Sequence, residues 1–252
     1  IIDSHCHLTF DPLAGDLEGV LLRAEAAGVS KIVVPAYDLE SWTVIKGMAN
    51  GSNIFAAFGL HPWTAQEELD IDALSALLER PEAVAVGEIG LDFKIDGEWD
   101  RERQLEIFRA QVALACDLDI PVILHCRGAF GEMIEVLQAC TPALRGVVHA
   151  YSRGPEMARR FLDLGLFSAF GGAVTRPNAH RTHRSAVAVP SDRLLIETDA
   201  PSIGLDGVPA EQAEPRHVLD VVLALADLRG ERPETTAAQT TANARSLFRF
   251  DG

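Results

Sequence analysis

The sequence predicts a single (β/α)₈ barrel, an α/β fold in which parallel strands alternate with helices. Three observations support this prediction. Apolar strand-like segments alternate with helical segments eight times along the 252 residues. Most of the strand-like segments are nearly continuous apolar runs, which are typical of parallel strands covered on both faces. Histidines and acidic residues follow the ends of several runs, and only a closed barrel brings the carboxyl ends of its first and last strands together.

The expected strands are short and bounded by turn residues. Runs such as Lys-Ile-Val-Val-Pro-Ala and Pro-Val-Ile-Leu-His-Cys show the pattern most clearly. A doubly wound open sheet is the alternative, but it would separate candidate site residues on the first and eighth strands. We expect strands at residues 1–6, 31–36, 54–60, 83–89, 121–126, 146–151, 166–171 and 193–198.

The expected helices lie between these strands. Gly28 is a suitable cap for the first helix, and Pro81 stops the third. In the fourth, apolar residues recur at helical spacing from Leu105 to Ala115. A final helix would follow the eighth unit and close the barrel. We expect helices at residues 17–27, 41–49, 71–79, 100–118, 133–140, 155–164, from about 178, 215–228 and 235–248.

Composition limits the class of protein. The chain is 48% hydrophobic and shows no linker or low-complexity tract, so we expect one domain over residues 1–252 and a monomer. The four cysteines lack CxxC spacing and are expected to be reduced. No secretory signal or membrane-spanning stretch is evident, which predicts a cytoplasmic protein. The net charge of −15 argues against broad, non-specific attraction to nucleic acid, but it does not exclude a phosphate-bearing substrate.

The first candidate metal ligands are the amino-terminal histidines and two acidic residues. His5 and His7 lie two residues apart after an apolar strand, so their side chains would project to the same side of the strand. Glu88 ends another apolar strand, where an unpaired carboxylate would be costly to bury, and such a carboxylate can bridge two metals. Asp199 ends the eighth strand and could both contact metal and take a proton from water. A strand-end salt bridge for Glu88 and a helix cap for Asp199 are the alternatives.

A second metal is suggested by two further histidines. His125 and His149 each follow a short apolar run and would lie at the barrel mouth. Either one alone is equally compatible with a role in the core. Imidazole and carboxylate ligands fit Zn²⁺ and other first-row divalent ions, whereas an all-oxygen set would favour Mg²⁺ or Ca²⁺. Asp92 and Glu197 are expected to lie outside the ligand set.

These motifs, taken in order, resemble the TatD family of metal-dependent hydrolases, which belongs to the amidohydrolase-like barrels. The resemblance spans nearly the whole chain, and its opening segments look closest to the YjjV branch. The motifs that carry it are Asp3-Ser-His5-Cys-His7, Gly59-Leu-His61-Pro62, Gly87-Glu88-Ile-Gly-Leu-Asp92, His125-Cys-Arg127, His149 and Glu197-Thr-Asp199-Ala-Pro.

The resemblance implies a specific site and activity. It places His5, His7, Glu88 and Asp199 around one divalent ion, and Glu88 with His125 and His149 around a second. The ions would be Zn²⁺, Mg²⁺ or Mn²⁺. The family usually hydrolyses phosphodiester bonds in DNA, often as an exonuclease, and some relatives remove acyl groups from tRNA.

Several basic residues are candidates for holding a phosphate. His61 and Arg127 follow strand ends beside the proposed metals, although each could instead be structural. The segment 175–184 carries Arg176, Arg181 and Arg184 without an acidic residue, and it follows the seventh strand, where barrels often bind phosphate. A solvated helix start is the alternative for this segment.

One departure from the family pattern bears on substrate choice. Many relatives have an Arg where this sequence has Glu211 and Gln212. The sequence still predicts a metal-dependent hydrolase of phosphoester bonds, in which Asp199 and Glu88 are catalytic and the substrate is DNA or a related nucleotide. Hydrolysis of an ester, amide or aminoacyl-tRNA bond is the enzymatic alternative. A metal- or nucleic-acid-binding barrel without catalysis is the other.

Overall fold

The predicted barrel is present in the computed structural model, which describes residues 1–95, 100–140 and 144–250. Eight parallel strands follow one another around the sheet in sequence order. Backbone hydrogen bonds just beyond the first strand join it to the eighth: Ser4 N–H donates to Ile196 O at 3.1 Å, and Asp199 N–H donates to His5 O at 2.9 Å. The strands are β1 (Ile2–Asp3), β2 (Lys31–Pro35), β3 (Ile54–Phe58), β4 (Ala83–Asp92), β5 (Val122–Arg127), β6 (Gly146–Val148), β7 (Phe167–Phe170) and β8 (Leu194–Ile196).

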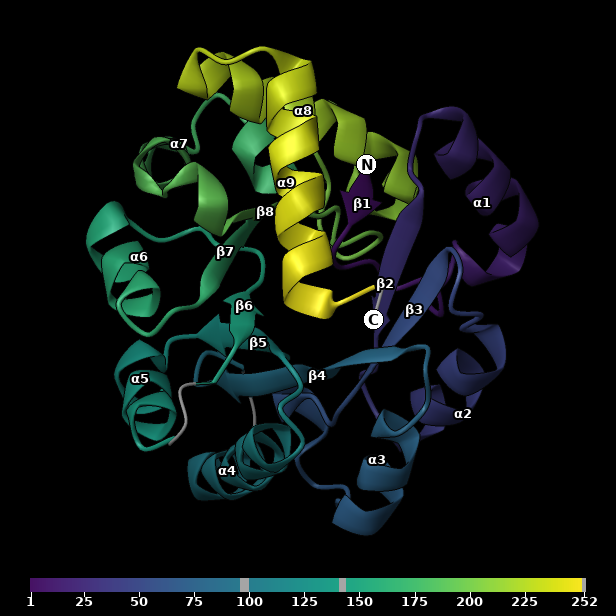
Figure 1. Cartoon of the computed structure of the whole chain (residues 1–252), viewed down its shortest axis with the longest axis vertical. Helices are drawn as coiled ribbons and strands as arrows, with labels where there is room; N and C mark the ends of the chain where they lie inside the picture. The colour runs from purple at the N-terminus through teal and green to yellow at the C-terminus, as the bar shows by residue number, and fades with distance from the viewer. Residues whose placement is uncertain (96–99, 141–143, 251–252) are drawn as a thin grey trace.

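Helices surround this ring of strands (Figure 1). The α-helices are α1 (Leu17–Ala26), α2 (Leu39–Met48), α3 (Ile71–Leu78), α4 (Arg101–Asp117), α5 (Phe130–Gln138), α6 (Pro155–Leu162), α7 (His180–Ala188), α8 (Val218–Arg229) and α9 (Pro233–Phe248). Short 3₁₀ turns lie between them at Ala14–Asp16, Pro62–Thr64, Gly172–Thr175, Ser191–Arg193, Ala210–Gln212 and Pro215–His217.

Element boundaries differ from the expected ones where the chain enters the mouth. β1 stops at Asp3, so His5 and His7 follow the strand and are not part of it. β4 instead continues to Asp92, and its register against β5 shifts between Val86 and Ile89. An apolar run does not show where the backbone leaves the ladder, because that depends on the neighbouring strands.

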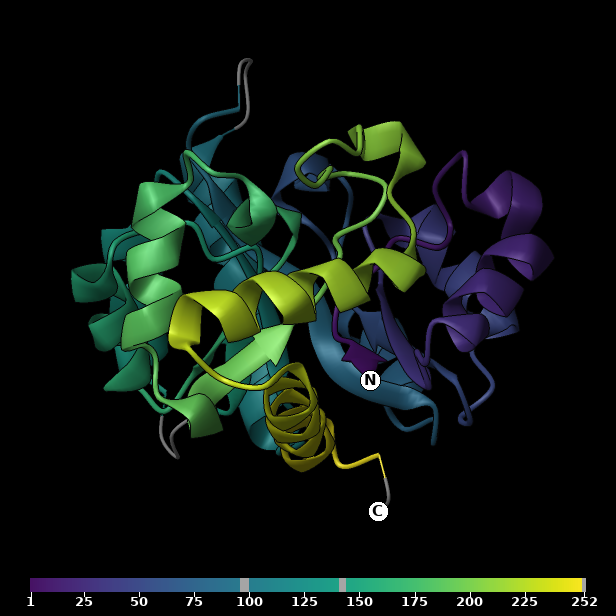
Figure 2. The ribbon, with the colours of Figure 1, turned by 90° about the horizontal axis from the view of Figure 1, so that it is seen from above.

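Two apolar layers stabilise the barrel. One lies between the strands and the surrounding helices. The other fills the barrel interior, where Phe55, Ile123 and Phe167 pack with Leu247 and Phe248 of α9. α9 therefore closes the amino end of the barrel, while the segment that follows β8 lies on the opposite side (Figure 2). The carboxyl ends of the strands are left to form the site.

Two further expectations can be compared with the structure. Cys6, Cys116, Cys126 and Cys140 are free thiols, as expected. In the described part of the chain, no helix has both the length and the apolar character needed to cross a membrane.

Candidate metal centre

Glu88 lies at the centre of the histidine cluster. It is 2% exposed, and its two carboxylate oxygens face different groups of imidazoles. Oε2 lies 3.2 Å from His5 Nε2 and 3.6 Å from His7 Nε2. Oε1 lies 3.0 Å from His125 Nδ1 and 2.8 Å from His149 Nε2. One carboxylate thus divides the four histidines that are candidate ligands into two pairs, and this is the arrangement that a bridging ligand between two metals requires.

Asp199 joins the pair formed by His5 and His7. Its Oδ1 lies 3.7 Å from His5 Nε2 and 3.4 Å from His7 Nε2, and the two ring nitrogens are 3.2 Å apart. Asp3 supports this group from behind, because its carboxylate accepts hydrogen bonds from Thr198 Oγ1 at 2.6 Å and from His5 N–H at 3.2 Å. The ends of the first and eighth strands are therefore held together beneath the candidate ligands.

His61 also approaches Glu88, with its Nε2 3.3 Å from Oε1. Its Nδ1 accepts a hydrogen bond from Trp63 N–H at 3.1 Å, so the ring proton lies on Nε2. Burial lowers the pKa of His61 to about 4, and the ring is therefore neutral at pH 7. This tautomer makes His61 a hydrogen-bond donor toward the centre. Its lone pair lies on Nδ1, which faces Trp63, so Nε2 cannot bind a metal in this state.

Asp92 connects His125 to Arg127, and this connection was not predicted from the sequence. Its fully buried carboxylate lies 3.2 Å from His125 Nε2, and it accepts hydrogen bonds from Arg127 Nε at 2.8 Å and from Trp63 Nε1 at 2.6 Å. If His125 presents Nδ1 to a metal, Nε2–H can donate to Asp92. This contact is the usual second hydrogen bond of a metal-bound imidazole.

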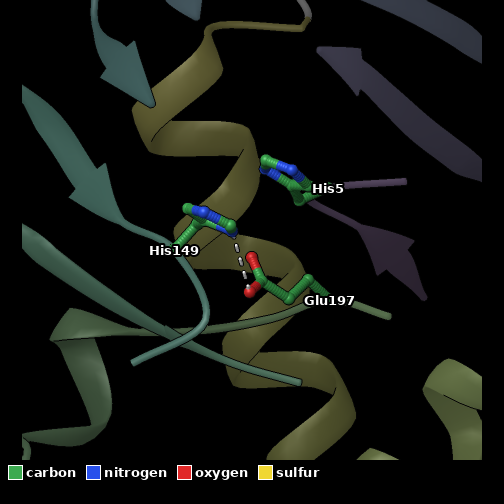
Figure 3. Close-up of side chains that lie close together, drawn as sticks. All are labelled: His5, His149 and Glu197. Carbon is green, nitrogen blue, oxygen red and sulfur yellow. Dashed lines mark ion pairs between the residues drawn. The ribbon is translucent and has the colours of Figure 1, made fainter. Parts of the chain in front are cut away.

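Glu197 lies next to His149 (Figure 3). It is fully buried, its Oε1 accepts a hydrogen bond from Ala150 N–H, and the same oxygen is 3.7 Å from His149 Nδ1. The rings of His5 and His149 stack with centroids 4.1 Å apart. One donor atom each of His5, His149 and Glu197 lies within 4.8 Å of the others. Glu197 is therefore positioned either to orient His149 or to bind a metal with His5 and His149, and its expected place outside the ligand set stays a prediction.

The electrostatics of the centre favour a bound cation. Burial disfavours the charged form of Glu88, but the surrounding imidazoles, His149 above all, hold the pKa of its carboxyl well below the usual range. For His149, burial opposes protonation, while Glu88 and Glu197 together raise its pKa well above the ordinary value. Without metal, a proton on His149 balances the buried carboxylates. A metal must displace that proton, so its binding weakens as the pH falls.

The residues present fit divalent metal ions. Imidazole nitrogens and carboxylate oxygens converge from β4, β5 and the segments that follow β1, β3, β6 and β8, and this is a donor set that Zn²⁺ and other first-row ions accept. Within the described residues, Asp199 Oδ1 is buried and has no hydrogen-bond partner, although it faces His5 and His7. Such an oxygen is costly unless a cation or a proton satisfies it.

Two adjoining pockets open at this centre. The mouth pocket, of about 510 Å³, is lined by every candidate ligand except His5, and also by Phe10, Tyr37, Trp63, Arg127 and Arg153. The side pocket, of about 720 Å³, is lined by the turns after β7 and β8. The residues that line both pockets are Ala150, Ser152, Asp199, Ser202 and Ile203.

The structure separates the basic residues of segment 175–184. Arg176 lines the side pocket, where its Nη2 donates to Gly204 O at 2.7 Å. Arg181 and Arg184 lie on α7 and face two smaller depressions. Glu211 and Gln212 are both exposed in a 3₁₀ turn next to Ala210, which lines the side pocket.

We expect replacement of Asp92 by Asn to weaken metal binding at His125 more than metal binding at His5, His7 and Asp199. Asp92 contacts His125 but none of His5, His7 or Asp199, and loss of such a contact typically lowers metal affinity by about 10- to 100-fold. Calorimetric titration of metal-stripped protein with Mn²⁺ would measure this loss. The exposed Asp72→Asn variant is the control. Equal weakening of both ions, or of neither, would contradict the prediction.

The fold and the centre define a class of protein. A (β/α)₈ barrel whose mouth gathers histidines and carboxylates able to bind divalent ions is the architecture of a metal-dependent hydrolase. The chain belongs to the family of TatD-related DNases, whose model matches residues 2–249.

Similar proteins agree with this assignment. The uncharacterized metal-dependent hydrolase YjjV of Escherichia coli K12 is 38% identical, with 98% of this chain and 97% of YjjV covered. The crystal structure of YjjV superposes with a TM-score of 0.92 at 37% identity and covers 99% of this chain and 98% of that one. The 3′-5′ ssDNA/RNA exonuclease TatD of Citrobacter koseri is 33% identical, with 98% of each chain covered.

Proposed function

We propose that this protein is a deoxyribonuclease that removes nucleotides from the 3′ end of single-stranded DNA with two divalent metal ions. The observation that carries the proposal is the position of Glu88, whose two oxygens face two separate histidine pairs. The name of the Citrobacter koseri relative, a 3′-5′ ssDNA/RNA exonuclease, supports the substrate and the direction.

In this proposal, one ion is held by His5, His7, Glu88 and Asp199, and the other by Glu88, His125 and His149. The ions would be Zn²⁺, Mg²⁺ or Mn²⁺. When bound, they supply an activated water and neutralise the charge that develops on the phosphoryl oxygens. Glu88 keeps both sites at a fixed separation, and Asp92 and Glu197 orient the histidines.

Asp199 is the proposed general base. The surrounding imidazoles, His7 first among them, hold the pKa of Asp199 below its ordinary value despite burial, so it is ionised at neutral pH. Its Oδ1 is one of several buried polar atoms among the described residues that have no hydrogen-bond partner. A carboxylate with a free oxygen at the centre can take the proton from the attacking water.

Arg127 and His61 are the proposed contacts to the scissile phosphate. The Nε of Arg127 donates a hydrogen bond to Asp92, and the residue lines the mouth pocket, so its two terminal nitrogens are the proposed donors. His61 presents a neutral Nε2–H toward the centre. Both donate hydrogen bonds that a phosphate oxygen accepts.

The mouth pocket suits a single strand. Phe10, Tyr37 and Trp63 line it with partly exposed rings, and unpaired bases stack on such rings. Glu88 lines the same pocket and is only 2% exposed. A base-paired duplex would be too wide to bring its backbone to Glu88. The aromatic wall therefore favours an unpaired strand.

The test is hydrolysis of 5′- and 3′-labelled 12-nucleotide single-stranded DNA by metal-stripped protein supplied with Mg²⁺, Mn²⁺ or Zn²⁺. We expect metal-dependent shortening from the 3′ end. Absence of cleavage by protein that carries metal would contradict the proposal. An aminoacyl ester assayed in parallel would then show whether the same centre hydrolyses that bond.

A further inference from the structure

Three arginines beside the mouth pocket have no role in the proposed chemistry at the metals. Arg153 follows β6, whereas Arg181 and Arg184 lie three residues apart on α7, so their side chains share one face of that helix. Arg153 lines both the mouth pocket and a neighbouring depression of about 440 Å³. Arg181 and Arg184 line that same depression, which places all three arginines along one continuous surface.

The framework beneath these arginines is fixed. Ser185 Oγ on α7 donates to Arg153 O at 2.6 Å, which ties the helix to the loop after β6. The Arg153 guanidinium lies over the Phe130 ring at 4.7 Å. A second depression of about 440 Å³ joins Ser152 to Arg181 and Arg184, and Ser152 also lines the mouth pocket. The surface therefore leads from the candidate metal centre to α7.

Three arginines gather on this surface of a strongly acidic chain. The protein has a net charge of −15, yet no carboxylate of the described residues forms an ion pair with Arg153, Arg181 or Arg184. Glu156 lines the same depression without such a pair. Arginines without an ion-pair partner in a strongly acidic protein are available to an anionic ligand.

We propose that Arg153, Arg181 and Arg184 form an arginine path that binds successive backbone phosphates of single-stranded nucleic acid beyond the scissile bond. This proposal rests on the proposed function and extends it, because it assigns the route by which the strand leaves the mouth pocket. Arg176 is not part of the path, since it faces the side pocket and is held by Gly204 O.

The path predicts that binding depends on strand length and on salt. A small phosphodiester reaches only the mouth pocket, whereas a longer strand also contacts α7. Each phosphate contact on a single strand contributes about 0.7 to the slope of log affinity against log salt concentration. Loss of Arg181 and Arg184 should therefore reduce that slope by roughly 1.4.

The experiment compares the Arg181→Ala/Arg184→Ala double variant with the wild-type metal-loaded protein. Fluorescence anisotropy gives the Kd of a labelled 12-nucleotide phosphorothioate DNA, which resists cleavage. Steady-state assays give KM for the corresponding DNA and for bis(p-nitrophenyl) phosphate. We expect both constants for the 12-mer to rise by about 10-fold, and well beyond any change in KM for the small diester.

Matched variants make the result specific. Arg109→Ala/Arg159→Ala removes the same charge from exposed positions on α4 and α6. Arg153→Ala should weaken 12-mer binding, whereas Glu156→Gln should strengthen it because the path loses a repulsive carboxylate. Equal Kd values for the α7 double variant and its charge-matched control would overturn the path.

The same measurements separate the path from the proposed function. If neither substrate is hydrolysed but the 12-mer binds less tightly to the α7 double variant than to its control, the path stands and the nuclease proposal fails. If DNA is cleaved from the 3′ end with the same KM in both variants, the nuclease proposal stands and the path fails. A loss of affinity that is equal for a 3-nucleotide and a 12-nucleotide strand would also overturn the path.

Discussion

Replacement of Glu88 by Gln is expected to lower metal binding at both proposed sites and to reduce kcat/KM by about 10³-fold or more. Each carboxylate oxygen faces one histidine pair. An amide keeps one acceptor oxygen and turns an N–H₂ group toward the other pair, so at least one metal loses its ligand. Metal content after desalting and hydrolysis of labelled single-stranded DNA would measure both effects.

Glu82 provides the matched control for Glu88. It is also a buried glutamate, it lies just before the same strand β4, and it pairs with Arg80 at the opposite end of the barrel. Glu82→Gln should therefore change the thermal stability without changing the number of bound metals. If Glu88→Gln retained two metals and wild-type kcat/KM, Glu88 would not be a bridging ligand.

Replacement of Asp199 by Asn is expected to act mainly on kcat, with a loss of about 10²- to 10⁴-fold. The amide cannot accept the proton from water, although its oxygen can still approach the metal held by His5 and His7. Metal affinity should therefore fall less than in Glu88→Gln. Single-turnover hydrolysis of the labelled 12-mer at saturating metal separates the chemical step from binding.

Asp206→Asn is a suitable control for Asp199, because Asp206 is an exposed carboxylate on the same segment after β8. It should leave the single-turnover rate within about twofold of the wild type. A wild-type rate in Asp199→Asn would remove Asp199 from the role of general base and would leave a metal-only mechanism to be considered.

Much of the fold and the convergence of the site could be predicted from the sequence. Apolar runs repeat with helical segments between them, because the buried residues of strands and helices must be apolar. His5, Glu88, His125 and Asp199 each follow such a run, and the closed sheet brings the ends of all strands to one mouth. The structure confirms the barrel and brings these side chains together, while their role as metal ligands stays a prediction.

The surroundings of the centre could not be predicted, because they depend on loops. Asp92 was expected outside the ligand set, but its simultaneous contacts to His125 and Arg127 require the course of β4 beyond residue 89. Arg153 was missed, although its place four residues after His149 could have indicated a residue at the mouth. Arg176 lies before α7 and lines the side pocket, whereas Arg181 lies on α7 and lines other depressions, and residue spacing does not reveal that separation.

The most direct test of the central claim is anomalous X-ray diffraction from crystals of the protein loaded with Mn²⁺. The account predicts two anomalous peaks about 3.5–4 Å apart on the two sides of Glu88. One peak should lie among His5, His7 and Asp199, and the other beside His125 and His149. A single peak, or two peaks that leave Glu88 without a metal contact, would contradict the binuclear centre.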